Sequence, residues 1–306
     1  MRETATPPIP AAALCALLAL TTPAFSQDEI AVFRSHSRLV VLHATVLDPQ
    51  GRRVTGLPMS AFRVFENGVE QQLKVFHRED SPVSIGLLID DSGSMIDKRQ
   101  KVAAAALSLV RASHPDDEVF ILHFNEKIYL DADFTSDRAR LEQGLAAFDS
   151  RGTTALRDAL RFAVEHMAQS ATEDKKVLVL VTDGEDNSSA IGPDYVIKLS
   201  QQNNVLIYAL GLLTQIDDER TQRARRELDA LTQATGGQAF YLHDVSETDS
   251  TAREIAREIR DQYTLAYSPS NERLDGTYRK IQVFASGPDG LTVRTRAGYY
   301  ATGAAR

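Results

Sequence analysis

The fold of this chain is decided by the segment Val83-Ser84-Ile85-Gly86-Leu87-Leu88-Ile89-Asp90-Asp91-Ser92-Gly93-Ser94. Its first seven residues form an almost continuous apolar run, which is typical of a strand buried on both faces of a parallel sheet. The run stops at Asp90, and polar residues follow at once. Open α/β sheets bind their ligands at the carboxyl ends of their strands, so this segment predicts both a fold class and the position of a site.

Similar apolar runs alternate with helical patterns from residue 83 to about residue 261. The expected strands are residues 83–89, 119–124, 128–130, 177–181, 205–210 and 238–242. The expected helices are residues 97–110, a helix capped by Ser136 that ends at Phe148, and residues 155–167, 193–199, 220–232 and 251–259. This alternation predicts an α/β fold with a doubly wound, mainly parallel sheet. The strand at 128–130 follows its predecessor too closely for a helical crossover, so we expect it to be an antiparallel edge strand.

Both flanks of this region have strand patterns instead. Residues 39–76 alternate in polarity around a type I turn signal at 48–51 and the hairpin signal Asn67-Gly68, and strands are expected again at 263–267, 278–284 and 291–296. Each flank alone has too few strands to bury a face. We therefore expect the N- and C-terminal segments to pair into one small all-β sandwich, into which the α/β domain is inserted.

The expected organisation has four parts: a signal peptide over residues 1–26, an N-terminal β segment over 27–81, the α/β domain over 82–261 and a C-terminal β segment over 262–306. The apolar run at 11–20 is too short to span a bilayer but suits a signal peptide, and Ala24 and Ser26 supply the small residues of a cleavage site. We expect an exported protein, periplasmic or secreted, with no membrane span after cleavage. The only cysteine, Cys15, lies in this leader, so the mature chain would have neither a disulfide nor a thiolate metal site.

The net charge of the chain disfavours two classes of partner. The formal net charge is -8 at pH 7. Nucleic acids and anionic lipid surfaces are bound through basic patches, so neither is an expected partner.

The polar residues that could carry chemistry lie in three loops. One holds Asp90, Ser92 and Ser94, the second holds Thr153 and Thr154 just before a helix, and the third holds Asp183 directly after the strand at 177–181. Each element alone is an ordinary turn sequence. Because ligand sites of such sheets lie at strand ends, the three loops can converge on one point above the sheet edge.

Together these residues resemble the metal-ion-dependent adhesion site of the von Willebrand factor type A family, whose pattern is Asp-x-Ser-x-Ser, a later Thr, and a later Asp in a Thr-Asp-Gly context. Asp90, Ser92 and Ser94 match the first element, and Asp183 matches the last. The family has a small residue five positions after its Thr, and Ala159 stands five positions after Thr154. The resemblance covers roughly residues 83–259. It implies a von Willebrand factor A domain that holds one divalent cation, Mg²⁺ or Mn²⁺.

The chemistry of the five residues suits such an ion. Mg²⁺ prefers six oxygen ligands in an octahedron and gives up its waters reluctantly. The hydroxyls of Ser92, Ser94 and Thr154 are neutral ligands, and the family arrangement implies that Asp90 and Asp183 reach the ion mostly through water. Two carboxylates balance the double charge of the ion without removing its attraction for a third anion. The expected function is therefore a cation-dependent adhesion or scaffold module that binds an Asp or Glu carboxylate of a partner protein.

The flanks are similar to those of bacterial proteins related to von Willebrand factor A, many from soil bacteria of the acidobacterial type. The matching features before the domain are Gly56-Leu57, Phe62 and Glu66-Asn67-Gly68. Those after it are Asp275-Gly276, Arg279-Lys280 and Arg296-Ala297-Gly298-Tyr299-Tyr300. These motifs indicate kinship and carry no chemistry.

Two other functions are open on the sequence. The first is a Mg²⁺-dependent hydrolase or phosphoryl-transfer enzyme, which Asp90-Asp91 at a strand end suggests, but no nucleophile or general base is evident beside the motif. The second is a structural domain with a vestigial metal site. We interpret Asp91 as a residue that supports the ligands from behind or caps their loop, and Glu185 and Asp186 as solvated loop acids.

Overall fold

The computed structural model describes residues 39–78, 81–145, 150–213, 219–242, 244–287 and 290–302. All of them belong to one compact unit that begins at Ser37. The expected signal peptide and its cleavage site lie outside the described residues. Across the described ranges, no helix is both long enough and apolar enough to cross a membrane.

The centre of the α/β domain is a six-stranded sheet with the strand order β10-β9-β8-β5-β6-β7. The strands are β5 (Val83–Asp90), β6 (Glu118–Phe124), β7 (Ile128–Thr135), β8 (Lys175–Thr182), β9 (Val205–Gly211) and β10 (Ala239–Tyr241). Neighbouring strands are parallel except for β7, which pairs antiparallel to β6 at the sheet edge. The predicted fold class and the predicted edge strand are confirmed.

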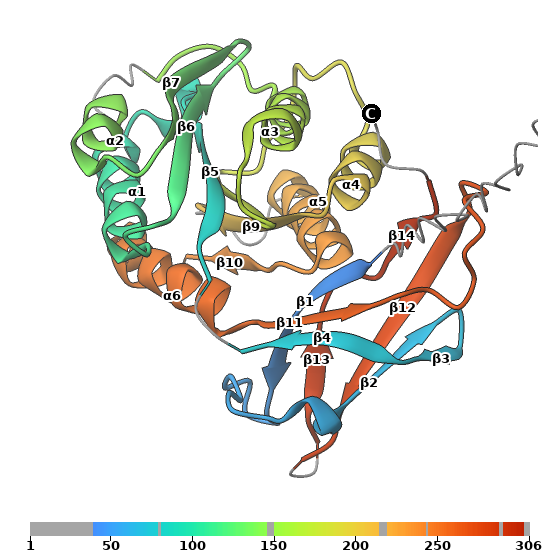
Figure 1. Ribbon diagram of the computed structural model, residues 1–306. Helices are drawn as coiled ribbons and strands as arrows, with labels where there is room; N and C mark the ends of the chain where they lie inside the picture. Colours follow the sequence, from blue (N-terminus) through green and yellow to red (C-terminus); the bar gives the residue numbers. More distant parts are fainter. Residues whose placement is uncertain are drawn as a thin grey trace, which may run out of the picture. The chain divides into compact units, whose positions relative to one another are not determined.

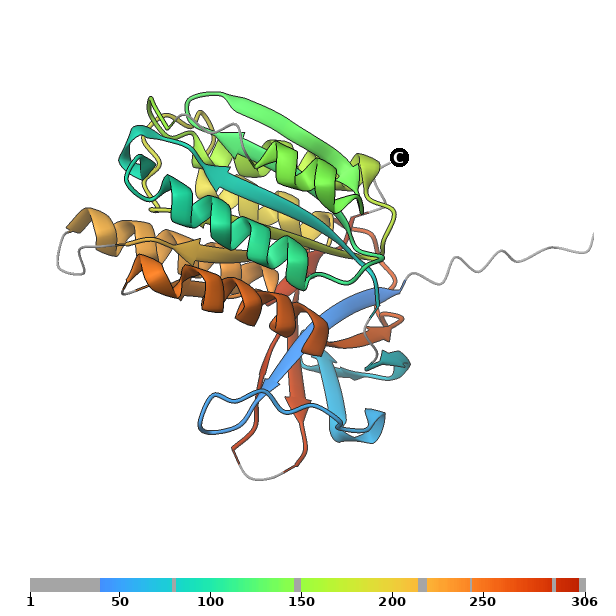
Figure 2. The same ribbon diagram turned by 90° about the vertical axis from the view of Figure 1, so that its left-hand side faces the viewer.

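Helices cover both faces of this sheet. They are α1 (Arg99–Ala112), α2 (Arg138–Gly144), α3 (Leu156–Ser170), α4 (Pro193–Gln202), α5 (Glu219–Thr235) and α6 (Thr248–Asp261). One buried cluster joins α1, α2 and α6 to side chains such as Leu87, and the other joins α3, α4 and α5 to the opposite face through Leu88. The two helix layers are separated by the sheet in Figure 1, and Figure 2 shows α1 and α6 side by side in front of it.

The flanks form two four-stranded sheets with the orders β13-β1-β11-β4 and β14-β12-β2-β3. The strands before the α/β domain are β1 (Val40–Leu47), β2 (Phe62–Glu66), β3 (Val69–Gln71) and β4 (Leu73–His77), and those after it are β11 (Tyr263–Tyr267), β12 (Tyr278–Ala285), β13 (Thr292–Arg294) and β14 (Gly298–Tyr300). Each sheet combines strands from both flanks (Figure 1). Leu42, Val64, Leu265 and Ile281 belong to one core between them, so a small sandwich of both flanks is present.

Local structure differs from expectation at two places. Asp137, and not Ser136, caps α2, because its carboxylate accepts a hydrogen bond from the backbone N–H of Ala139 at 2.9 Å. The end expected for this helix, Phe148, lies outside the described residues. The segment Gly298–Tyr300 was expected only as a family motif, yet it forms β14 by pairing with β12.

Candidate metal centre

Asp90 and Thr182 end two neighbouring strands of the central sheet, β5 and β8. The strands are parallel, and Ile89 pairs with Val181. The loops that follow both strands therefore leave the same edge of the sheet. This is the edge at which the sequence places the candidate site.

The Asp90 carboxylate is held from two sides. It is 2% exposed. Its Oδ1 accepts a hydrogen bond from the backbone N–H of Ser92 at 3.0 Å, and its Oδ2 accepts one from the Thr182 hydroxyl at 2.6 Å. The hydroxyls of Ser92 and Ser94 lie 3.1 Å apart. Three of the five predicted ligands are thus joined by direct hydrogen bonds.

Burial of Asp90 disfavours its ionised form. Desolvation is the main cause, the negative charge of Asp183 adds to it, and the hydrogen bonds from Ser92 and Thr182 oppose it, which together raise the pKa of Asp90 to about 7. A positive ion beside this carboxylate would favour the ionised form again. The electrostatics of the site therefore suit a cation.

Asp91 ties the second loop to the first. Its Oδ1 accepts hydrogen bonds from the backbone N–H of Ser150 at 2.8 Å and from the Ser150 hydroxyl at 2.7 Å. The backbone N–H of Gly93 also donates to the Gly152 carbonyl at 3.1 Å. The loop that leads to Thr154 is thereby fastened against the loop of Asp90, and the interpretation of Asp91 as a loop-capping residue is confirmed.

Thr154 is held in turn by the third loop. Its backbone N–H donates to the side-chain carbonyl of Asn187 at 2.9 Å, and its carbonyl accepts from the backbone N–H groups of Asn187 and Ser188, both at 3.1 Å. These bonds use the backbone of Thr154 and not its hydroxyl. The residue is 2% exposed, so its position is fixed by the loop that follows β8.

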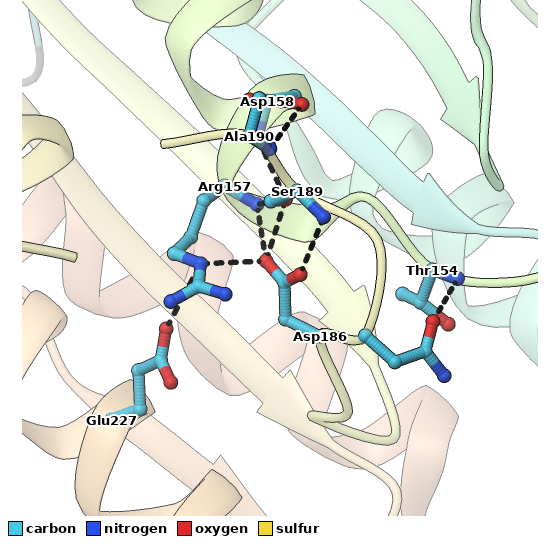
Figure 3. Close-up of polar contacts among 8 residues, drawn as sticks. Thr154, Arg157, Asp158, Asp186, Ser189, Ala190 and Glu227 are labelled. Atoms are coloured by element: carbon cyan, nitrogen blue, oxygen red, sulfur yellow. Dashed lines mark hydrogen bonds and ion pairs between the residues drawn. The ribbon is translucent and has the colours of Figure 1, made fainter. Parts of the chain in front are cut away.

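Asp186 anchors this third loop on the start of α3 (Figure 3). Its Oδ2 accepts from the backbone N–H and the Nε of Arg157, each at 2.9 Å, and from the Ser189 hydroxyl at 2.7 Å. The side chain is 2% exposed, so the interpretation of Asp186 as a solvated acid was wrong. The N-cap residue of α3 is Ala155, which has no side-chain acceptor, and Asp186 supplies one from a distant loop. In the sequence, the alanine at this N-cap position was the signal that another residue must supply the acceptor.

Asp183 is the least satisfied of the five residues. Within the part of the chain that the structure describes, its Oδ1 is buried without a hydrogen-bond partner. Its Oδ2 lies 3.6 Å from the Nζ of Lys98, and the two side chains are 10% and 15% exposed. The sequence interpretation did not include Lys98, and it therefore counted the charge of the site as two carboxylates alone.

A comparison with known families identifies the family of the α/β domain. The von Willebrand factor type A domain family matches residues 84–255, more than half of the chain. This chain belongs to that family. Domains of the von Willebrand factor A type commonly serve as adhesion or protein-interaction modules.

Individual relatives of this von Willebrand factor A protein are distant. An uncharacterized protein of Synechocystis sp. is 24% identical over 185 residues, which are 58% of this chain and 42% of that protein, so the chain spans less than half the length of this relative. A solved von Willebrand factor type A protein of Catenulispora acidiphila is 16% identical, with a TM-score of 0.50 over 87% of this chain and 75% of that one. The von Willebrand factor domain of the pilus tip protein Mfa5 of Porphyromonas gingivalis is 14% identical, with a TM-score of 0.48 over 58% and 95%.

The residues of the von Willebrand factor A domain fit a small divalent cation. Among the described residues, no group of three or more His, Cys, Asp or Glu could hold a metal. The three loops at this edge offer hydroxyls of Ser92, Ser94 and Thr154 beside two carboxylates. A buried carboxylate oxygen without a partner costs about 1–3 kcal/mol, and the Oδ1 of Asp183 would gain a partner, directly or through water, from a bound cation.

Proposed function

We propose that this von Willebrand factor A domain is a divalent-cation-dependent protein-binding module, used for adhesion or scaffolding. Asp90, Ser92, Ser94, Thr154 and Asp183 would hold Mg²⁺ or Mn²⁺. The observation that carries the proposal is the unpartnered Oδ1 of Asp183. It is buried at the sheet edge where the backbone N–H of Ser92 donates to the Asp90 carboxylate and the Ser92 hydroxyl lies beside that of Ser94.

The ligand follows from the charges. A bound cation supplies an electrophilic centre that accepts an oxygen donor. Asp90 and Asp183 neutralise two positive charges, and Lys98 contributes one more positive charge at the same edge. A net positive site favours an anionic oxygen, and the carboxylate of an Asp or Glu side chain is the form in which a protein presents one. The proposed partner is therefore a protein with an exposed acidic residue.

The acidic residues around the site favour binding over catalysis. A hydrolase needs a carboxylate or another base that is available to activate water. Asp91 is engaged with Ser150, and Asp186 is engaged with Arg157 and Ser189, so both fasten loops. Their use as structural anchors supports a rigid binding surface.

We further propose that the protein works outside the cytoplasm, in the periplasm or as a secreted protein. The support comes from the sequence, in which the apolar run at 11–20 precedes small residues at Ala24 and Ser26. Fractionation of cells that express the full chain tests this, with N-terminal sequencing of the exported form. A cytoplasmic protein with an intact N-terminus would contradict it.

Calorimetry with Mg²⁺ tests the cation site directly. The full mature chain should bind one Mg²⁺, and Asp183→Asn should abolish binding because the variant keeps the shape of the side chain and removes its charge. Glu185→Gln is the matched control, since Glu185 lies two residues away in the same loop and outside the proposed set. Absence of Mg²⁺ binding by the unmodified chain, or equal binding by Asp183→Asn, would refute the proposal.

A further inference from the structure

Lys98 occupies a fixed position beside the candidate metal centre. It precedes α1, and its backbone N–H donates to the Met95 carbonyl at 2.9 Å, one turn beyond Ser94. Its Nζ donates to the Leu212 carbonyl at 3.3 Å and lies 3.6 Å from the Oδ2 of Asp183. The ammonium group is thus held between the loop after β8 and the residue that follows β9.

The burial of Lys98 strengthens the interaction of its charge with Asp183. Its side chain is 15% exposed and that of Asp183 is 10% exposed, so water screens their interaction only partly. The contact between them is an ion pair at 3.6 Å and not a hydrogen bond of normal length, whereas the Leu212 carbonyl accepts a bond from the same ammonium group. Asp183 is therefore neutralised by Lys98 but remains available as a ligand.

We propose that Lys98 is a resident cation of this site that competes with the divalent ion for Asp183 and so lowers the affinity for that ion. This inference rests on the proposed function, because it assumes that a divalent cation binds at Asp183. Without a divalent ion, and with both acids ionised, the two acids and Lys98 give the site a net charge of one negative. After an ion with two positive charges binds, the same groups give a net charge of one positive, which sets the preference of the site for an anionic partner.

The charge of Lys98 thus has two opposite effects. It repels an incoming divalent cation, and it strengthens the attraction of the occupied site for a carboxylate. A lysine that served only to hold the loops together would have neither effect on cation affinity. Removal of its charge should therefore tighten cation binding, an outcome that simple damage to the site would not produce.

Titration of Mg²⁺ alone into the full mature chain tests this by calorimetry at moderate ionic strength. Lys98→Met keeps an unbranched side chain and removes the charge, so the Kd for Mg²⁺ should fall by on the order of tenfold, or about 1.4 kcal/mol. Lys98→Arg retains the charge and should stay within about threefold of the unmodified chain. Lys101→Met removes an exposed charge one turn further along α1 and should change the Kd less than about twofold.

The outcomes separate this inference from the proposed function. If Lys98→Met binds Mg²⁺ as weakly as the unmodified chain or more weakly, while Asp183→Asn abolishes binding, Lys98 is not a competing cation and the cation site stands. If neither the unmodified chain nor Lys98→Met binds Mg²⁺, both proposals fail. Melting in the presence of chelator checks the fold: Lys98→Met should unfold cooperatively there, and Mg²⁺ should raise its Tm at lower concentrations than it does for the unmodified chain.

Discussion

The hydroxyl of Thr182 donates a 2.6 Å hydrogen bond to the buried carboxylate of Asp90, and this bond joins the ends of β5 and β8. The same hydroxyl accepts a bond from the backbone N–H of Gly184 at 2.9 Å. Gly184 has a φ of +83°, a conformation that glycine adopts without strain. One threonine therefore sets both the orientation of the first acid and the turn that carries the second, Asp183.

Thr182→Val should weaken both the fold and the cation site. Valine has nearly the same shape but leaves the Oδ2 of Asp90 without this donor, which should lower the free energy of unfolding by about 1–3 kcal/mol. Mg²⁺ affinity should fall as well, because Asp90 and Asp183 lose their common support. Urea denaturation and calorimetry provide the two measurements. Thr153→Val, at an exposed threonine of the adjacent loop, is the control and should change stability by less than about 0.5 kcal/mol.

Asp186→Ala should destabilise the domain through α3. The variant removes one of two acceptors for the first-turn N–H of Arg157 and the acceptor for the Ser189 hydroxyl, so the free energy of unfolding should fall by about 1–2 kcal/mol. Because the same loop fixes the backbone of Thr154, Mg²⁺ binding should weaken without being lost. Glu185→Ala, next to it, should have little effect on unfolding. Equal stability of the two variants would show that Asp186 does not anchor the loop.

Much of the fold follows from the sequence, because strands buried on both faces must be apolar along their whole length. That rule located β5, β8 and β9, and the polar residues after β5 and β8 marked the edge of the sheet. The roles of Lys98 and Asp186 could not be predicted in this way, since each side chain contacts a residue that is distant in sequence. The periodicity of apolar residues indicates which face of a strand or helix is buried. It does not indicate which distant loop will contact a given polar side chain.

Acid should destabilise the protein partly through His43. This residue of β1 is buried, and its pKa is well below the usual value, first because of burial and then because of the positive charges of Lys175 and Arg296. In the unfolded chain the pKa of a histidine is about 6.5, so His43 binds a proton below that pH. In the folded chain its lowered pKa disfavours the protonated form. The contribution of His43 to stability is therefore complete above pH 6.5 and decreases as the pH falls below it.

His43→Gln checks this prediction by comparison. Between pH 7 and pH 5, the free energy of unfolding of the unmodified chain should decrease relative to that of the variant, by up to about 1.4 kcal/mol per pH unit. Asp90, whose pKa is raised to about 7, has the opposite effect on stability in this range and is common to both proteins, so it cancels in the difference. Parallel pH profiles of the two proteins would contradict the assignment to His43.

Residues 82–262 should fold as an isolated fragment. Both buried clusters on the faces of the central sheet are contained in this range, so the fragment has a complete core. Residues 27–80 alone should remain unfolded, because β1 pairs with β11 and β13, and β2 keeps only its hairpin partner β3 when β12 is missing. A dispersed amide NMR spectrum is expected for the first fragment only. A dispersed spectrum for residues 27–80 would show that the N-terminal strands do not need those partners.

Partner binding should depend on the cation far more than on salt. Chelator and Ser92→Ala should each abolish binding, and replacing one particular acidic residue of the partner by alanine should do the same. Between low and moderate salt the affinity should change little, because the net charge of -8 provides no long-range attraction for an acidic partner. Co-precipitation from the envelope fraction, with Mg²⁺ and with chelator, measures both effects. Binding that survives chelation would place the interaction on another surface.

The pairing of β1 with β11 also governs the order in which the chain can assemble. Leu42 is opposite Leu265, so more than 200 residues must emerge between one strand and its neighbour. At about 5–20 residues per second, synthesis of these residues takes roughly 10–45 s, and most of them belong to the α/β domain. Throughout this interval β1 lacks β11, and the backbone N–H and C=O groups that will pair with β11 can bond to other chains instead.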